Sequence, residues 1–600
     1  MPGIAGIISQ RPAAECQALV KAMVAAMAYE SFYRSGTHFI PELGIYGGWV
    51  ASENSFAANQ IFLNEQQDIA LIFSGEIFLD AETGAGLKQK GHRLDVHKAS
   101  WLVHLYEEEG QKFFEKLNGL FSGLLIDRRH GKAFLFNDRY GFQRIYFHEG
   151  RDAIYFASEA KALLRVLPEL RGFDAAGVAQ FLAVGCTLDG RTLFRGVQSL
   201  PGGSCWTFEN GNCRHGKYFS PEIWESQPTL APAEFESQLE ATFKRILPRY
   251  FASDAKIGVA LTGGLDSRMV MAGRPPDRRD QICYTYSGTH GETWDDKIAA
   301  RVAAACGLEH KLLRLQPDFF PGFATHADRT VFVTDGCFGI TGAHEIYFNR
   351  QARQLSPVRL TGVFGSEVLR GVSTFKPIKL SPGLVAPELL PAIESSARQL
   401  TGVKQHPVGF AVFKEIPWNI FGSVRACQSQ VDFRTPYLDN ELVALAYRTP
   451  ASLQKSAAAA FRFVKKNDAV LGRIPTDMGY AGDDSGSIRR AFLKVTFKLD
   501  YLCNDGLPHW LSPFDPFFDR LYSGSGILGT HKYLRYRRWL RGALAGYLND
   551  ALADAQRAQS PFWNVDFLKQ MAAQHISGRK NYLREINAVL TLRAVERLLF

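Results

Sequence analysis

The sequence has 600 residues, which is too many for one hydrophobic core, so we expect two or more domains. With 46% hydrophobic and 22% charged residues, the composition is typical of a soluble globular protein. A net charge of +9 is only mildly basic for this length, so it favours anionic ligands but does not call for a nucleic acid partner.

Strand-like alternation of apolar and polar residues dominates the first 220 residues. Helical periodicity appears at Glu15 to Tyr29 and at Lys98 to Glu109, so a layered α+β domain is predicted. The predicted strands are Ile4 to Ile8, Ile69 to Phe73, Leu120 to Asp127, Lys132 to Phe136, Ile145 to Phe147 and Ile154 to Ala157.

A Pro-rich, weakly patterned stretch from Ser220 to Pro232 is predicted to be a linker. Beyond it, strand and helix signals alternate, which favours a parallel sheet with helices on both faces. The predicted strands are Ile257 to Leu261, Gln281 to Tyr286, His310 to Leu315 and Val358 to Leu360, and the predicted helices lie near 233–247, 265–272 and 295–306.

The stretch from Lys256 to Ala272 has the pattern of an anion-binding site. A short apolar strand leads into Thr262-Gly263-Gly264 and then into a helix. Two glycines let the backbone approach an oxyanion closely, and the first amides of a helix direct unpaired N–H groups and a positive dipole end toward it. Asp266 adds a carboxylate that suits a magnesium ion on a polyphosphate. The alternative is an ordinary strand-to-helix turn, because Gly-Gly pairs are common.

The amino-acid sequence of this loop favours the first interpretation, an anion-binding site. TGGLDSR, at 262–268, resembles the Ser-Gly-Gly-Leu/Val-Asp-Ser pyrophosphate loop of the asparagine synthetase superfamily, whose enzymes form an acyl-adenylate and release pyrophosphate. No Gly-Lys-Ser/Thr follows the glycines, so it is not a Walker A loop. The resemblance implies ATP and Mg²⁺ as cofactors. The residues it assigns to ATP and pyrophosphate are Leu261, Thr262, Gly263, Gly264, Leu265, Asp266, Ser267 and Gly362.

The N-terminal region resembles the glutaminase (class II amidotransferase) domain that precedes the synthetase domain in asparagine synthetase. The pieces that match, in the same order, are LVHLYEEEG at 102–110, LNGLFSGLLIDRR at 117–129, NDRYGFQRIYF at 137–147, FASEAKALL at 156–164 and SLPGG at 199–203. The resemblance implies an Ntn-type layered fold for this domain and an α/β fold of the ATP-pyrophosphatase type for the C-terminal domain. The predicted division is 1–219, a linker at 220–232, and 233–600.

The glutaminase chemistry is predicted to be lost. Pro2 stands where the family has its nucleophilic cysteine, and Ser74-Gly75-Glu76 replaces the Asn-Gly-Glu that supplies the oxyanion hole. The Arg-Gly-Pro-Asp stretch that helps to hold glutamine is absent, and the family's Asp before the helix at 101–109 is replaced by the sequence HKAS at 97–100. We therefore expect the domain to persist as an interface, a docking surface or a cover for the other site.

The synthetase motifs are only partly kept. TGVFGSE, at 361–367, lies where the family has Thr-Gly-Glu-Gly-Ala-Asp-Glu, so the resemblance assigns Mg²⁺ to Asp266, Ser366 and Glu367 and puts Val363 in place of a catalytic glutamate. RTPYLDNEL, at 434–442, matches Arg-Val-Pro-Phe-Leu-Asp-His-x-Leu closely. PTDMGY, at 475–480, corresponds to Arg-x-Lys-x-Gly-Phe, which makes Asp477 the counterpart of a charge-stabilising lysine. Candidate replacement cations are Arg268 and Lys465.

The predicted function is an ATP-dependent ligase that adenylates a carboxylate and joins it to an amine. Two nitrogen sources stay open: free ammonia, or an amine of the substrate itself, as in the similar β-lactam synthetases and lasso peptide cyclases. We favour the second, because an ammonia-dependent enzyme would be expected to keep the glutamate that Val363 replaces. A different class remains as an alternative: an ATP-binding scaffold without catalysis, since Val363, Ser366 and Asp477 all depart from the family pattern.

The expected substrate is a small molecule or a peptide, with a precursor peptide or a protease as a candidate partner, and relatives often form homodimers. Neither secretion nor membrane insertion is expected, because the sequence lacks a signal-like apolar core and any apolar run of about 18 residues. The nine cysteines show no Cys-x-x-Cys or Cys/His ligand spacing. Reduced thiols in a cytoplasmic protein are the simplest interpretation.

Overall fold

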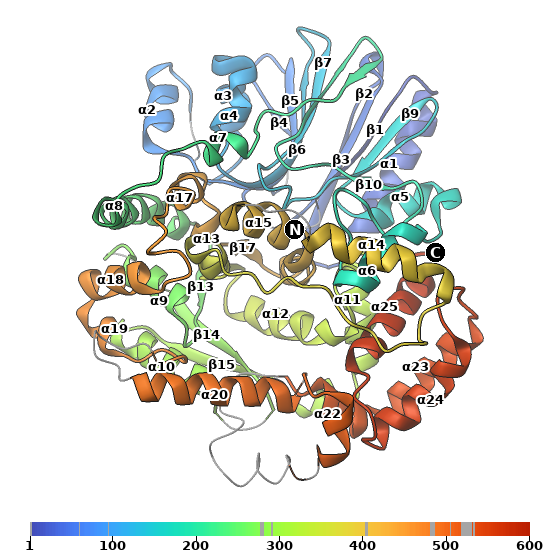
Figure 1. Ribbon diagram of the computed structural model, residues 1–600. Coiled ribbons are helices and arrows are strands. Elements are labelled where there is room, and N and C mark those ends of the chain that lie inside the picture. The colour runs from blue at the N-terminus through green and yellow to red at the C-terminus, as the bar shows by residue number, and fades with distance from the viewer. Residues whose placement is uncertain are drawn as a thin grey trace.

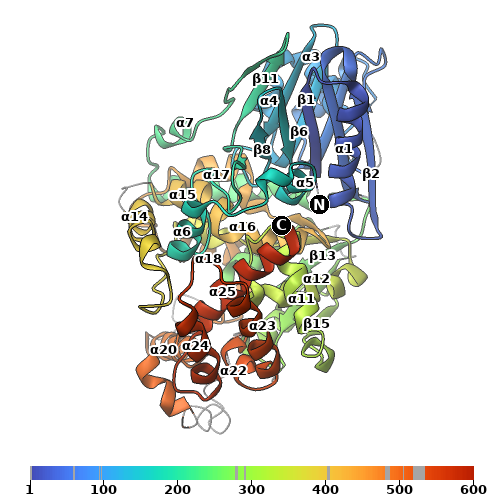
Figure 2. The ribbon, with the colours of Figure 1, turned by 90° about the vertical axis from the view of Figure 1, so that its right-hand side faces the viewer.

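The computed structural model describes residues 3–600 except 54, 59–60, 94, 96, 277–280, 290–291, 402–405, 480–486, 505, 516, 518–530 and 532–533. Two antiparallel sheets form the N-terminal part, and a parallel sheet among helices forms the C-terminal part (Figures 1 and 2). The predicted fold class, a layered α+β domain followed by an α/β domain, is confirmed.

Each antiparallel sheet has six strands. The first has the order β10-β8-β9-β1-β3-β2 and the second β12-β11-β7-β6-β5-β4. Their bounds are β1 Gly3–Ser9, β2 Tyr33–Ile40, β3 Ile45–Ser52, β4 Phe62–Leu63, β5 Ile69–Ile77, β6 Gly119–Asp127, β7 Lys132–Asn137, β8 Tyr146–Glu149, β9 Ala153–Ala157, β10 Gln198–Ser199, β11 Cys205–Glu209 and β12 Asn212–Arg214.

The two sheets pack face to face between helices. Alternation along β1 and β5 sets the layers: Ile4 and Ile72 belong to the core between the sheets, whereas Ile7 packs with α1 and Leu71 with α3. The helices of this part are α1 Ala13–Met27, α2 Ala81–Gln89, α3 Trp101–Glu109, α4 Phe113–Lys116, α5 Ala160–Val166 and α6 Ala175–Val184.

The C-terminal sheet is parallel throughout, in the order β15-β14-β13-β16-β17. Its strands are β13 Ile257–Ala260, β14 Ile282–Ser287, β15 His310–Arg314, β16 Val358–Thr361 and β17 Asp432–Arg434. Alternation again separates two faces, since Cys283 packs with Ile298 of α10 (Trp294–Ala305) and Tyr286 stacks on Phe348 of α12 (Ala343–Leu355). Parallel strands covered on both faces are buried and apolar, as β13 is.

The remaining helices surround this sheet and continue to the C-terminus. They are α7 Glu222–Glu225, α8 Pro232–Phe251, α9 Leu265–Ala272, α11 Phe323–Val333, α13 Gly365–Arg370, α14 Leu390–Thr401, α15 Pro407–Phe410, α16 Phe421–Gln428, α17 Asn440–Ala446, α18 Ala458–Asn467, α19 Ala469–Arg473, α20 Ser487–Asn504, α22 Tyr536–Arg541, α23 Ala545–Arg557, α24 Val565–Ile576 and α25 Leu583–Leu599. Among the described helices, none is long and apolar enough to cross a membrane.

Buried polar contacts join the two parts. The carboxylate of Glu159, at the start of α5, accepts hydrogen bonds from Lys161 at 2.6 Å and from Tyr29 at 2.9 Å, and it pairs with Arg425 of α16. Lys161 also pairs with Asp335 at 3.0 Å. Burial alone would raise the pKa of Glu159, but the two cations outweigh burial and lower it. The domains are therefore held at a charged, dehydrated junction.

All the predicted strands are present, and seven further strands were not predicted. β2, β3, β4, β10, β11 and β12 complete the antiparallel sheets, and β17 completes the parallel one. The predicted helix at Lys98 begins at Trp101, and the helices at 265–272 and 295–306 are confirmed as α9 and α10.

Candidate active site

The Thr262-Gly263-Gly264 loop lies at the carboxyl end of β13 and leads directly into α9, for which Gly264 is the N-cap. The Thr262 hydroxyl accepts from the Gly264 amide at 3.2 Å and lies 3.1 Å from the Ser267 hydroxyl. The Gly263 amide donates to the carboxylate of Asp295 at 2.6 Å. Loop and helix thus form the expected turn, at the sheet edge where open α/β sheets bind ligands.

Asp266, in the first turn of α9, is surrounded by groups from two distant segments. Its carboxylate accepts a hydrogen bond from the Ser366 hydroxyl at 2.6 Å and lies 3.7 Å from the Arg370 guanidinium. Its carbonyl accepts from the Tyr437 hydroxyl at 2.8 Å. Burial raises the pKa of Asp266, although Arg370 and Ser366 oppose the rise. The structure therefore brings together Asp266 and Ser366, two of the residues that the resemblance assigns to Mg²⁺.

Glu367 lies next to this pair. Burial is the main reason that its pKa is raised to about 7, and the negative charge of Asp266 contributes. Two neighbouring carboxylates and a hydroxyl form a set of oxygen donors, which is the ligand type that Mg²⁺ prefers. Asp266, Ser366 and Glu367 thus fit a magnesium site.

Two glycines of the 361–367 segment allow it to approach α9. A Cβ on Gly362 would lie 2.3 Å from the amide nitrogen of Ser267, and a Cβ on Gly365 would lie 2.6 Å from the side chain of Asp266. Any side chain at Gly362 would meet backbone, which cannot move aside easily. The assigned role of Gly362 in the site is thus consistent with a position directly against the loop.

Arg268 does not face the phosphate side of the loop, and this corrects the sequence-based expectation. Its side chain is fully buried and donates to the carbonyl oxygens of Ile474, Pro475 (3.2 Å) and Gly263 (3.4 Å). Burial lowers its pKa to about 10. Arg268 anchors the segment after α19 to the loop and is not available as a cation for a ligand.

Asp477 belongs to the segment that Arg268 anchors. Its amide donates to the Gly263 carbonyl at 3.1 Å, and a Cβ on Gly263 would lie 3.2 Å from the Asp477 Cβ. Burial, and then the charge of Asp295, raise the pKa of Asp477 to about 6. A carboxyl group therefore stands against the loop where the resemblance implies a lysine. Tyr480, the end of that motif, lies outside the described residues.

Neither of the two remaining assigned positions supplies a group beside Asp266. Lys465 is exposed in the last turn of α18, where its Cα would be 3.0 Å from a Cβ on Gly472. In the part of the chain that the structure describes, the contacts of Asp266 come from α13 and Tyr437, and Lys465 is not among them. Val363 is half-buried, and its carbonyl accepts from Thr435 at 2.7 Å.

In the N-terminal part, Ser74 and Gly75 lie within β5, and Pro2 lies outside the described residues. Ser74 is buried, and Gly75 has a φ of 104° with a Cβ position 2.1 Å from the Leu120 carbonyl, so only glycine fits there. Glu76, the next residue, forms a two-pronged ion pair with Arg434 of β17, one contact being 2.8 Å. Two family-like motifs therefore meet across the domain junction.

The Arg434 motif contributes further to this junction. Asp439 caps α17 and accepts from Asn118 at 2.9 Å and from Tyr250 at 3.1 Å. Asn440 donates from its amide to Asn118 at 2.9 Å. The 434–442 segment thus connects the N-terminal part, through Asn118, to α8 of the C-terminal part, through Tyr250.

A cavity of about 1200 Å³ lies beside the ion pair between Glu76 and Arg434. The N-terminal part lines it with Asp95 and His97, and the C-terminal part with Lys256, just before β13, and with Asp432 at the start of β17. The cavity is therefore at the amino edge of the parallel sheet, opposite the Thr262 loop. Burial raises the pKa of Asp432 to about 6.

The comparisons with known proteins agree with this arrangement. A family model for the glutamine amidotransferase domain matches residues 1–219, and a model for asparagine synthase matches residues 238–406. The second match contains the loop, Asp266 and the 361–367 segment. The chain belongs to the asparagine synthetase superfamily.

Curated asparagine synthetases resemble the chain over part of their length. A glutamine-hydrolysing asparagine synthetase of Bacillus subtilis is 26% identical over 287 residues, or 45% of this chain and 38% of its own length. Another from the same organism is 22% identical over 334 residues, covering 52% and 53%. One from Arabidopsis thaliana is 26% identical over 239 residues, covering 40% and 36%. The chain thus spans between about a third and about half of the relatives' lengths.

Two solved structures share weaker likenesses. The glutamine phosphoribosylpyrophosphate amidotransferase of B. subtilis, complexed with ADP and GMP, has a TM-score of 0.27 and 12% identity over 52% of this chain and 65% of its own. An NH₃-dependent NAD synthetase of Campylobacter jejuni has a TM-score of 0.18 and 15% identity over 31% and 78%. Scores this low establish neither a shared fold nor a shared activity.

Three groups of the candidate site had no predicted role in the sequence. Arg370 reaches both Ser366 and Asp266, Tyr437 binds the Asp266 carbonyl, and Asp295 binds the Gly263 amide. Only Arg370 carried a signal, because it stands four residues after Ser366 on the same short helix and so shares its face.

Proposed function

We propose that the protein is a carbon–nitrogen ligase that adenylates a carboxylate with Mg-ATP and couples it to an amine of the same substrate. The observation that supports it best is the cluster of Asp266, Ser366 and Glu367 against the Thr262-Gly263-Gly264 loop. In the first half-reaction a carboxylate oxygen attacks the α-phosphorus and pyrophosphate leaves. In the second, the amine attacks the acyl carbon, loses a proton and expels AMP.

The chain's own residues bind and orient the phosphates. The first-turn amides of α9 lack intrahelical acceptors, and with the Thr262 and Ser267 hydroxyls they provide donors for the departing pyrophosphate. Arg370, beside Asp266, is a cation that can reach the same charge. Mg²⁺ held by Asp266, Ser366 and Glu367 would neutralise polyphosphate charge as it develops.

Glu367 is the proposed proton acceptor in the second half-reaction. A carboxyl group whose pKa is about 7 is matched to proton transfer near neutral pH, whereas an ordinary glutamate is too weak a base. Val363 offers no acid or base group, so the chemistry cannot rest on that position. Protonation of Glu367 would also remove one ligand of Mg²⁺, so activity should rise with pH as Glu367 loses its proton.

The residues of the N-terminal part favour an amine of the substrate, rather than glutamine, as the source of nitrogen. Pro2 and Ser74 replace the thiol and amide that the resemblance assigns to glutamine hydrolysis, and Glu76 is engaged by Arg434 across the junction. A lactam or a peptide macrocycle is the product class that follows. Free ammonia as the nitrogen source is the alternative within the same reaction type.

Two observations favour a different class of protein, an ATP-binding scaffold without catalysis. Asp477 places a carboxyl group against Gly263, which disfavours the build-up of negative charge there, and Arg268 is turned away. Such a protein would bind nucleotide without forming AMP.

The test is nucleotide turnover by the full-length protein with Mg-ATP and pools of candidate amine-containing carboxylates, measured as AMP and pyrophosphate. We expect AMP that depends on substrate and does not require glutamine. Asp266→Ala should lower the rate by about 100-fold or more, and Asp550→Ala, at an exposed site on α23, should not. AMP only with added ammonium would favour amidation from ammonia. ATP binding without AMP for every pool would refute the ligase and support the scaffold.

A further inference from the structure

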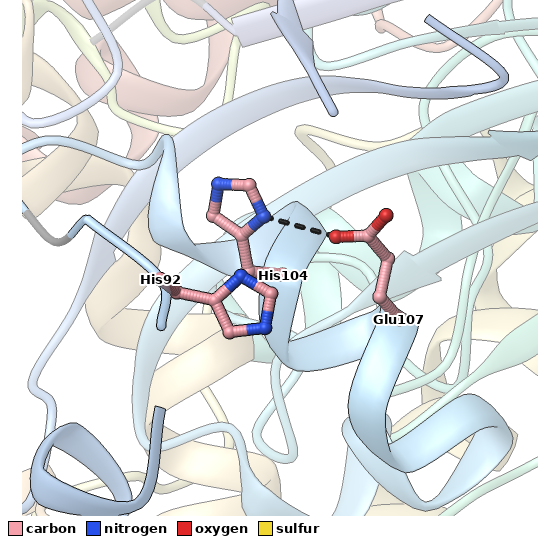
Figure 3. Close-up of side chains that lie close together, drawn as sticks. All are labelled: His92, His104 and Glu107. Carbon is pink, nitrogen blue, oxygen red and sulfur yellow. Dashed lines mark hydrogen bonds and ion pairs between the residues drawn. The ribbon is translucent and has the colours of Figure 1, made fainter. Parts of the chain in front are cut away.

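Two histidines and a glutamate converge on the outer side of the N-terminal part, far from the proposed nucleotide loop in sequence and fold. His104 and Glu107 stand three residues apart on α3, and His92 follows α2 (Figure 3). One ligand atom from each of the three lies within 4.8 Å of the others. In the part of the chain that the structure describes, this is the one place where three such metal-binding side chains meet.

Two of the three side chains point at one another, and the third stacks on one of them. Nδ1 of His104 lies 2.9 Å from a carboxylate oxygen of Glu107, and the rings of His92 and His104 are 4.7 Å apart (Figure 3). Ligands of a tetrahedral zinc ion, each at 2.0–2.1 Å, are about 3.3 Å apart, which is close to the separation of His104 and Glu107. The His92 ring, which stacks on His104, would turn to direct a nitrogen at the ion. All three side chains are largely buried, with 10–16% of their surface exposed.

Outer contacts restrain His92 and Glu107. Nε2 of His92 bonds to Glu108 at 2.8 Å, which leaves Nδ1 as the nitrogen for an ion. The second oxygen of Glu107 accepts from Asn64 at 2.8 Å, and Asn64 is itself buried. Carboxylate–histidine and amide–carboxylate contacts of this kind fix tautomer and direction around metal centres.

The local charge also calls for a cation. Glu65 lies 3.8 Å from Nδ1 of His104, and together with Glu107 and Glu108 it makes three carboxylates beside the two imidazoles. Lys90 neutralises one of them, Glu108, at 2.6 Å, and lowers its pKa. Glu65 is exposed and can supply a fourth ligand.

We propose that His92, His104 and Glu107 form a structural site for a transition-metal dication, with Zn²⁺ as the first candidate. Two imidazoles with carboxylate ligands suit zinc better than Mg²⁺ or Ca²⁺, which prefer oxygen donors alone. The ion ties the segment after α2 to α3. That segment continues into Asp95 and His97, which line the cavity between the two parts. The site therefore fixes a wall of this cavity.

The test is zinc affinity of the metal-free full-length protein, measured at neutral pH by competition with a chromophoric chelator. We expect one tight equivalent for the wild type. His92→Asn and Glu107→Gln should each weaken it by more than about 100-fold, and Glu108→Gln, which removes only the outer contact, by roughly 10-fold. His130→Asn is the matched control, because His130 pairs with Asp127 and is 65% exposed.

A second readout separates metal binding from misfolding. Zinc should raise the thermal midpoint of the wild type and of His130→Asn, but not that of His92→Asn, while the metal-free proteins melt alike. Equal zinc binding by wild type, His92→Asn and Glu107→Gln would place the ion on other ligands, such as thiols, and overturn the proposal. So would wild-type binding no tighter than that of His92→Asn.

Discussion

Replacing Asp477 by asparagine should stabilise the protein at neutral pH. The side chain is half-buried against Gly263, and its pKa is raised from 3.8 to about 6 by burial and by Asp295. A raised carboxyl pKa means that the folded protein holds its proton more tightly than the unfolded chain. Stability is therefore lost as pH rises from about 4 to about 6, and the full cost remains above that window.

The shift sets the size of the effect. At 1.36 kcal/mol per pKa unit, a rise from 3.8 to about 6 corresponds to about 3 kcal/mol. Water screens part of this because Asp477 is partly exposed, so we expect a gain of about 1–2 kcal/mol for Asp477→Asn above pH 6. The amide oxygen of asparagine can still accept the hydrogen bond that Met478 donates at 3.0 Å.

The assay is urea unfolding of wild type and variant at several pH values between about 5 and 8, with Asp550→Asn as the control at an exposed position. The difference in unfolding free energy should grow as pH rises to about 6 and then stay constant. The uncharged variant should also bind Mg-ATP more tightly at pH 8 if the loop holds phosphates. A variant that is less stable than wild type at pH 8, or a difference independent of pH, would refute the buried-carboxylate reasoning.

Two further substitutions test contacts that the fold creates. Gly362→Ala puts a methyl group 2.3 Å from the amide nitrogen of Ser267, so it should displace the first turn of α9 and cost about 1–3 kcal/mol. AMP formation should fall with it; retention of both stability and turnover would contradict the close approach. Arg425→Met removes one of the two cations, Arg425 and Lys161, that pair with the buried Glu159, and should cost about 3–5 kcal/mol in urea unfolding. Adding Glu159→Gln should restore part of the loss, and a double variant as unstable as the single one would argue against a charge effect.

The local elements of the fold were predictable where the sequence has a strong period. The parallel strand β13 was expected because Ile257 to Leu261 is a short apolar run before a glycine turn, and α9 follows it as predicted. β2 and β3 were missed for opposite reasons. β2 is mostly polar on a sheet edge, whereas β3 is buried throughout and contains two glycines, so neither alternates clearly.

In the candidate site, too, some features could be predicted from the sequence and others could not. The loop and the pairing of Asp266 with Ser366 could be expected, because the carboxyl ends of adjacent parallel strands meet at one edge. The role of Arg268 could not, since the carbonyls of Ile474 and Pro475 that it binds lie more than two hundred residues later in the chain. A long side chain at a helix start can turn either way, and packing alone selected the buried direction.

The sequence by itself determined the strand–turn–helix units, the order of the two domains and the residue types around the loop. These follow from local hydrophobic periodicity, from the backbone freedom of glycine and from the residues of the sequence motifs. Tertiary structure decided which charged groups meet. It paired Glu76 with Arg434, placed Asp477 against Gly263 and brought His92 to α3. Such contacts depend on how distant elements pack, and burial then sets the pKa values and partners that no local pattern encodes.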